Sequence, residues 1–137
     1  MFRQALGISF LGRDRECDDA TSDIERLLGD EDRAISVITV SELLHGVHRA
    51  QGAIRTQRRA FVEHVLAGLE AIPITEPVAR VHAEIWSDLA VRGQLIGAHD
   101  LWIAATALAN GLGVATRNSE HFDRVAGLRL ITAGNRK

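Results

Sequence analysis

The chain has 137 residues, of which 46% are hydrophobic and 25% are charged, and its formal net charge is −2. This length suits one domain around a single core, so we expect residues 1–137 to form one unit. The balanced charge excludes a protein whose whole surface attracts nucleic acid, so any basic patch must be local. Cys17 is the single cysteine, which excludes an internal disulfide and a cysteine metal cage.

The sequence also shows no membrane or export signal. No apolar run approaches the 18 or so residues that a membrane-spanning helix needs. The first residues, MFRQALGISFLGRDRE, lack the long apolar region and small-residue cleavage site of a secretory leader. We therefore expect a cytoplasmic protein that does not bind membranes.

The first third of the chain predicts a strand, a helix and a second strand. A short strand followed by a turn is expected in QALGISFLG (residues 4–12), and a helix in TSDIERLLG (residues 21–29), where Gly29 ends it. The β-branched and apolar run Ala34–Ile38 predicts a buried strand. A helix follows that strand directly.

The remaining two thirds alternate helices with short strands. Apolar residues at helical spacing predict amphipathic helices over Ile54–Leu69 and Glu76–Arg92, with the short strand AIPIT between them. An apolar helix follows Asp100, and strands are expected at Gly113–Thr116 and in LRLIT (residues 128–132). This alternation predicts an α/β fold in which a parallel sheet lies between two layers of helices.

Three polar residues fall near the ends of predicted strands, where folds of this class bind ligands. Glu42 comes four residues after the predicted strand end at Ile38, Asp100 precedes the apolar helix, and Asn118 follows the strand that ends at Thr116. Carboxylate and amide oxygens are hard ligands suited to Mg²⁺ or Mn²⁺. Such an ion would activate water and stabilise the charge on a phosphodiester under attack.

Each of these residues also has a purely structural interpretation. The segment from Thr39 to Glu42 matches a capping box, in which the glutamate bonds the first amide of the helix. The helix dipole favours Asp100 at a helix start whatever its function. Asn118 after a strand is typical of a turn. Their joint placement at strand ends is what favours a metal site.

The six histidines do not form a recognisable metal motif. His45 and His48 lie three residues apart, and His45 is one turn from Glu42, but the segment lacks the spacing and internal glutamate of zinc proteases. The other four histidines are scattered, and we expect surface or packing roles for them: His64, His82, His99 and His121.

Three segments together resemble the PIN-domain family, and within it the VapC-type toxins of bacterial toxin–antitoxin pairs. They are ISVITVSELLHGVHRA, then VARVHAEIWSDLAVRGQLIGAHDLWIAATALANGLGVATRN, then HFDRVAGLRL, and they span residues 35–130 in the same order and spacing as in the family. The resemblance implies a parallel sheet between helices. It also implies a metal-dependent endoribonuclease whose acidic pocket holds Mg²⁺ or Mn²⁺ and cuts tRNA or another structured RNA.

The resemblance also implies roles for individual residues. Glu42 matches the acid of the second strand–helix junction, and Asp100 matches the central metal-binding aspartate. Asn118 occupies the fourth pocket position, where family members carry Asp or Asn. Thr116 and Ser9 would support the ligands without binding the metal themselves.

The chain departs from the family pattern at its first strand. Family members end this strand in D-T-S or D-x-S, and the aspartate is a principal metal ligand. Gly7 stands in its place here, so the resemblance leaves two carboxylates and predicts weaker metal binding or an inactive site. Three explanations stay open: a degraded active site, an introduced substitution, or an altered reading frame at the start of the gene.

The family resemblance further implies an antitoxin partner, a homodimer and a basic groove that contacts RNA. Candidate phosphate contacts are Arg49, Arg92 and Arg117, although solvent-exposed surface roles or the codon usage of a GC-rich genome also explain an arginine-rich chain. A further basic cluster comprises Arg55, Arg58 and Arg59. Two other functions stay open: a non-catalytic module that binds an antitoxin or RNA, and a nuclease that acts on DNA.

Overall fold

A computed structural model of the chain describes residues 4–6, 33–116 and 119–132. Several predictions therefore lie outside the described residues. They are the helix expected at residues 21–29 and the site residues Gly7, Ser9, Arg117 and Asn118.

The described strands form one parallel sheet with the order β3-β2-β1-β4-β5. Its centre is β1, in which Leu6 lies opposite Ile35 on one side and Ala115 on the other. All carboxyl ends therefore meet at one edge of the sheet. The strands are β1 (Gln4–Leu6), β2 (Arg33–Ser36), β3 (Glu70–Ile72), β4 (Gly113–Thr116) and β5 (Leu130–Thr132).

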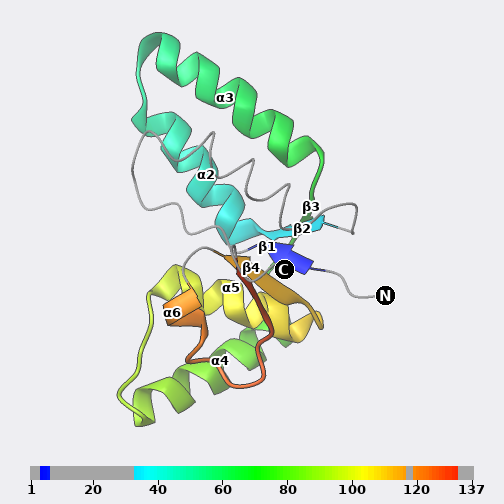
Figure 1. Cartoon of the computed structure of the whole chain (residues 1–137), viewed down its shortest axis with the longest axis vertical. Coiled ribbons are helices and arrows are strands. Elements are labelled where there is room, and N and C mark those ends of the chain that lie inside the picture. Colours follow the sequence, from blue (N-terminus) through cyan, green and yellow to red (C-terminus); the bar gives the residue numbers. More distant parts are fainter. Residues whose placement is uncertain (1–3, 7–32, 117–118, 133–137) are drawn as a thin grey trace.

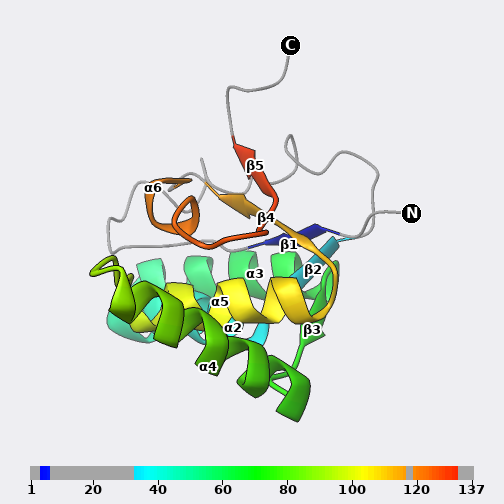
Figure 2. The same cartoon turned by 90° about the horizontal axis from the view of Figure 1, so that it is seen from below.

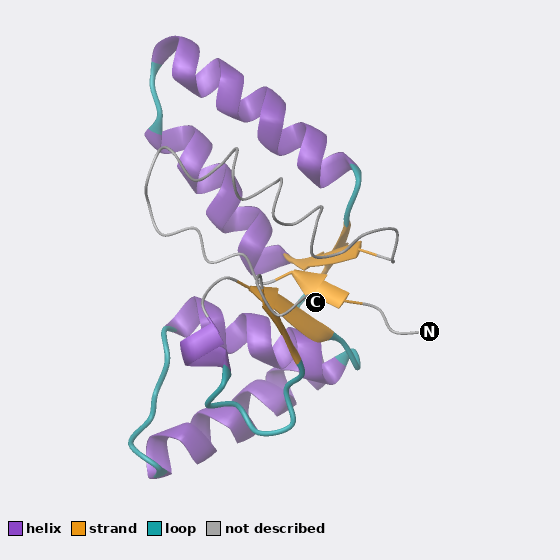
Figure 3. Cartoon of the chain, in the orientation of Figure 1, coloured by secondary structure: helices purple, strands orange, loops and turns teal. Residues whose placement is uncertain are grey.

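The described helices lie on both sides of this sheet, as Figures 1 and 3 show, and they confirm the predicted three-layer α/β/α class. One side carries α2 (Val37–Arg49) and α3 (Gly52–Ala67), which pack against each other. The other side carries α4 (Glu76–Val91), α5 (Ala98–Ala109) and α6 (Ser119–Phe122). In Figure 2, α4 and α5 run side by side, and their contacts are extensive.

Neighbouring residues of β2 belong to two separate hydrophobic cores, which is direct support for burial on both faces. Ala34 and Ile35 are both fully buried. Successive side chains of a strand point to opposite faces. Ala34 joins the cluster formed with α4, α5, β4 and α6, whereas Ile35 packs with Leu43, Val47 and Val62 of α2 and α3.

The junction between β2 and α2 differs from the prediction. The strand ends at Ser36 rather than at Ile38, and the helix begins at Val37. The Ser36 side chain accepts a hydrogen bond of 3.2 Å from the backbone N–H of Thr39, which caps the helix. The capping-box interpretation of Glu42 is therefore wrong, because Glu42 lies in the second turn of α2 and not in its first.

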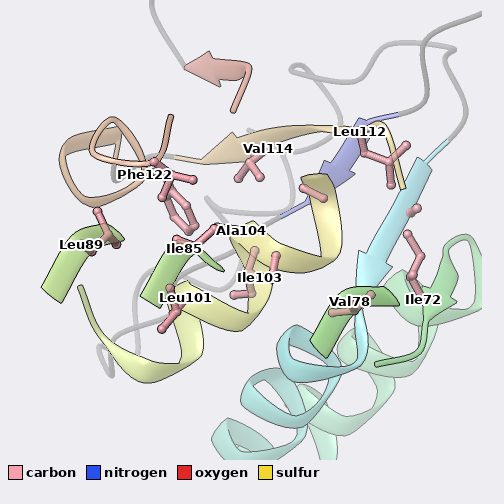
Figure 4. Close-up of a cluster of buried hydrophobic side chains, with 14 residues drawn as sticks. Ile72, Val78, Ile85, Leu89, Leu101, Ile103, Ala104, Leu112, Val114 and Phe122 are labelled. Atoms are coloured by element: carbon pink, nitrogen blue, oxygen red, sulfur yellow. The ribbon is translucent and has the colours of Figure 1, made fainter. Parts of the chain in front are cut away.

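The short helix α6 was not predicted from the polar segment that contains it. Its last residue, Phe122, is fully buried in the cluster on the α4–α5 side of the sheet. Figure 4 shows Phe122 pointing into the same cluster as Ile85, Leu89 and Val114. Burial of this ring fixes α6 against the sheet, close to the carboxyl end of β4.

Candidate functional site

Asp100 lies in the first turn of α5 and is almost completely buried. The residue that precedes the helix is Gly97, which has no side chain to cap it. The Asp100 carboxylate contacts another element instead: its Oδ2 is 3.2 Å from Nδ1 of His121 in α6. The Asp100 side chain therefore contacts His121 and does not act as the helix cap. The helix dipole still stabilises a negative charge at this position.

Glu42 is the second largely buried acid at this edge of the sheet. Its side chain is only 13% exposed, and its Oε2 is 3.7 Å from Nδ1 of His99. Its Oε1 is fully buried and has no hydrogen-bond partner among the described residues. An unsatisfied buried carboxylate oxygen is costly, so its presence in a folded protein calls for an explanation.

The two acids influence each other across the contact between α2 and α5. Burial raises the pKa of Glu42 above its ordinary value, His99 opposes this shift, and the Asp100 carboxylate raises the pKa further. Two like charges close together in a partly dry site repel each other unless a cation lies between them. The electrostatics therefore favour binding of a positive group at this place.

A divalent cation fits these residues. Mg²⁺ in proteins is usually held by one or two carboxylates, with waters and substrate phosphate completing its shell. Glu42 supplies a buried oxygen that no described residue bonds, and Asp100 supplies a second carboxylate. No group of three or more His, Cys, Asp or Glu among the described residues could hold a metal unaided. Water, substrate and residues outside the described ranges, such as Asn118, would have to supply the remaining ligands.

The other predicted site residues have mixed outcomes. Thr116 is the last residue of β4 and is buried, so it lies at the same sheet edge, and its supporting role stays a prediction. Asn118, Ser9 and Gly7 lie outside the described residues. His45 and His48 are exposed on α2.

Sequence reasoning missed the two histidines beside the acids. His99 and His121 were assigned ordinary surface or packing roles, yet they contact Glu42 and Asp100 respectively. The position of His99 directly before Asp100 was the available signal for one of them. No local pattern indicates that His121, 21 residues further along the chain, returns to the same carboxylate.

The candidate RNA-contacting arginines are engaged to different degrees. Arg92 binds the Asp88 carboxylate at 2.6 Å, the Gln94 side chain and the backbone carbonyl of Arg124. Its guanidinium therefore ties the end of α4 to the segment after α6, and its RNA contact stays a prediction. Arg49 is exposed at the end of α2 and makes no hydrogen bond or ion pair within the described chain.

Arg55, a member of the predicted basic cluster, also has a structural role. Its side chain donates to the backbone carbonyls of Ala50 and His48, so it supports the turn between α2 and α3. Arg58 is partly buried and Arg59 is exposed.

Within the part of the chain that is described, no helix is long and apolar enough to cross a bilayer.

Comparison with known proteins decides the family. The family model of the PIN domain matches residues 8–128. Ribonuclease VapC1 of Rickettsia felis is 35% identical to this chain over 103 residues, which cover 74% of this chain and 77% of the relative. The chain belongs to the VapC family of PIN-domain proteins.

Other VapC proteins are similar in sequence and in structure. The tRNA(fMet)-specific endonuclease VapC of Salmonella typhimurium is 33% identical over 96 residues, which cover 70% of this chain and 71% of the relative. The toxin–antitoxin complex VapBC-5 of Mycobacterium tuberculosis contains a chain that superposes with a TM-score of 0.75 and 32% identity. That match covers 97% of this chain and 100% of the other. The resemblance seen in the sequence is therefore confirmed.

Proposed function

We propose that this VapC-family chain is the toxin of a toxin–antitoxin pair and acts as a divalent-metal-dependent endoribonuclease. The observation that carries the proposal is the pair of largely buried carboxylates, Glu42 and Asp100, in which Oε1 of Glu42 has no hydrogen-bond partner among the described residues. A bound Mg²⁺ or Mn²⁺ would supply an activated water and positive charge for phosphodiester hydrolysis.

The residues of the chain would perform three tasks in this reaction. Glu42 and Asp100 would bind the cation, and their burial would keep bulk water from competing for it. His99 and His121 would hold the two carboxylates in position. Asn118 would complete the pocket after β4, as the family resemblance implies.

Gly7 limits the strength of this site. The family pattern places a carboxylate there, and a glycine has no side-chain oxygen to offer. A divalent cation held by two carboxylates is bound more weakly than one held by three. We therefore propose that cleavage is slow and requires a high concentration of Mn²⁺ or Mg²⁺.

The relatives support the proposed substrate and partner. One relative is named a tRNA(fMet)-specific endonuclease, and the similar structure is a member of the VapBC family of toxin–antitoxin systems. We propose a tRNA or another structured RNA as substrate and a homodimer as the active assembly. We also propose an antitoxin that covers Glu42 and Asp100, the acidic pair.

The test is cleavage of tRNA by the purified chain in the presence of Mn²⁺. We expect slow cleavage that Asp100→Asn abolishes and Gly7→Asp accelerates. The matched control is Arg80→Ala on α4, whose side chain is 74% exposed and pairs with Glu76. No cleavage by either the native chain or Gly7→Asp would reject the proposal.

A second function is favoured by Gly7 alone. A chain that lacks the first carboxylate could serve as a non-catalytic module that binds the antitoxin. Isothermal titration separates the two functions: tight antitoxin binding without any Mn²⁺ binding supports the second. A parallel assay on single-stranded DNA tests whether the chain is a nuclease that cleaves DNA in place of RNA.

A further inference from the structure

His121 forms a hydrogen bond with the Asp100 carboxylate. Its Nδ1 lies 3.2 Å from Oδ2 of Asp100. The side chain of Asp100 is 12% exposed and that of His121 is 38% exposed, so the contact is partly shielded from water. An ionised carboxylate can only accept hydrogen bonds, so an ionised Asp100 requires the proton of this contact on Nδ1 of His121.

The two residues come from elements that are both anchored in the same hydrophobic cluster. Asp100 belongs to α5, which is buried over most of its length. His121 belongs to α6, which is anchored by the fully buried ring of Phe122 and by Val125 just beyond it. The contact therefore joins two helices whose buried side chains hold them in the core.

We infer that His121 is a positioning residue for Asp100, a role that rests on the proposed metal-dependent function. Its Nδ1–H fixes the rotamer of the carboxylate through Oδ2 and leaves the second oxygen for the cation. Replacement of a residue that holds a metal-binding carboxylate through its outer oxygen typically lowers metal affinity by about 10–100-fold. Because Gly7 removes one carboxylate, the orientation of each remaining ligand matters more in this chain.

Two substitutions separate positioning from general packing. In His121→Asn the side-chain amide nitrogen takes the place of Nδ1 and can still donate to Asp100. In His121→Gln the amide nitrogen takes the place of Nε2, on the far side of the ring, and the contact with Asp100 is lost. The matched control is His64→Asn, since His64 is exposed on α3, away from the acidic pair.

The experiment is Mn²⁺ titration by calorimetry, carried out in the native chain and in Gly7→Asp, with melting temperatures measured alongside. We expect His121→Gln to weaken Mn²⁺ binding about 10-fold. His121→Asn should recover most of the affinity, and His64→Asn should leave it unchanged. All variants should keep similar melting temperatures, because His121 is partly exposed.

The outcomes distinguish this inference from the proposed function. Equal Mn²⁺ affinity in the native chain, His121→Gln and His121→Asn would overturn the positioning role alone. Equal loss in both His121 variants would also overturn it, because recovery by asparagine is its signature. Absence of Mn²⁺ binding in both the native chain and Gly7→Asp would overturn the proposed function, and the positioning role with it. Detection of the Nδ1 proton of His121 by NMR, and its loss in Asp100→Ala, tests the hydrogen bond without metal.

Discussion

Replacement of Phe122 by alanine should weaken both the fold and the site, because this ring connects the core to α6. Phe122 is completely buried and is the largest fully buried side chain among the described residues. Truncation of a buried phenylalanine to alanine costs about 3–5 kcal/mol, from lost transfer energy and from the cavity that remains. A chain of 137 residues has a free energy of unfolding of roughly 7–20 kcal/mol. The variant should therefore stay folded at 25 °C, with a melting temperature lower by roughly 10–20 °C.

The assay is urea unfolding followed by the fluorescence of Trp86 and Trp102, with Mn²⁺ titration on the folded variant. Phe61→Ala is the matched control, because Phe61 is only partly buried and packs against the other core, beside α2 and α3. We expect the larger loss of stability in Phe122→Ala, and weaker Mn²⁺ binding in that variant only. A loss below about 1 kcal/mol in Phe122→Ala would refute the argument that this ring fixes α6.

Three further predictions concern the rest of the fold and the acidic pair. Gly46→Ala in α2 should raise the free energy of unfolding by about 0.5–1 kcal/mol, because the added Cβ would meet no atom within 4 Å. Gly111→Ala should lower the free energy of unfolding, because φ is +67° at this position. Thermal melts of both variants test these two predictions. Arg92→Ala should destabilise the protein more than Arg80→Ala, because Arg92 also binds the backbone beyond α6; equal melting temperatures would disprove this. The raised pKa of Glu42 stabilises the folded state below the ordinary value of 4.5, and this contribution is lost as the pH rises through the raised pKa. The free energy of unfolding of the native chain should therefore fall as the pH rises above 4.5, and Glu42→Gln should lack this fall. Urea unfolding of both proteins from pH 4 to 7 is the test, and parallel pH profiles would contradict the prediction.

The regular elements could be predicted wherever their local pattern and their packing agree. The strand Gly113–Thr116 was predicted with its observed bounds, because a short apolar run between a helix end and a polar segment allows few alternatives. The helix Glu76–Val91 was also predicted within one residue. In both cases the pattern of buried residues matches the period of the element.

The start of α2 shows where local propensity misleads. Residues Val37 to Val40 are β-branched and favour a strand, yet they form the first turn of a helix. The Ser36 cap and the burial of Thr39 outweigh this propensity, which amounts to a few tenths of a kcal/mol per residue. A sequence pattern of this kind does not separate the two outcomes, because the deciding contacts are tertiary.

The candidate site was predicted in its acids but not in their partners. Glu42 could be found because it follows a predicted strand, and Asp100 because it lies at the start of a helix. His121 could not, because its contact with Asp100 depends on the way in which the buried Phe122 orients α6. Contacts between distant segments of this kind leave no periodic signal in the sequence.

The most direct test of the account is an anomalous-scattering map of a crystal soaked in Mn²⁺. We expect a peak within coordination distance of the carboxylates of Glu42 and Asp100, stronger in Gly7→Asp than in the native chain. No peak beside these two residues in either crystal, while the protein still cleaves RNA with Mn²⁺, would contradict the claim that the buried acid pair is the metal site.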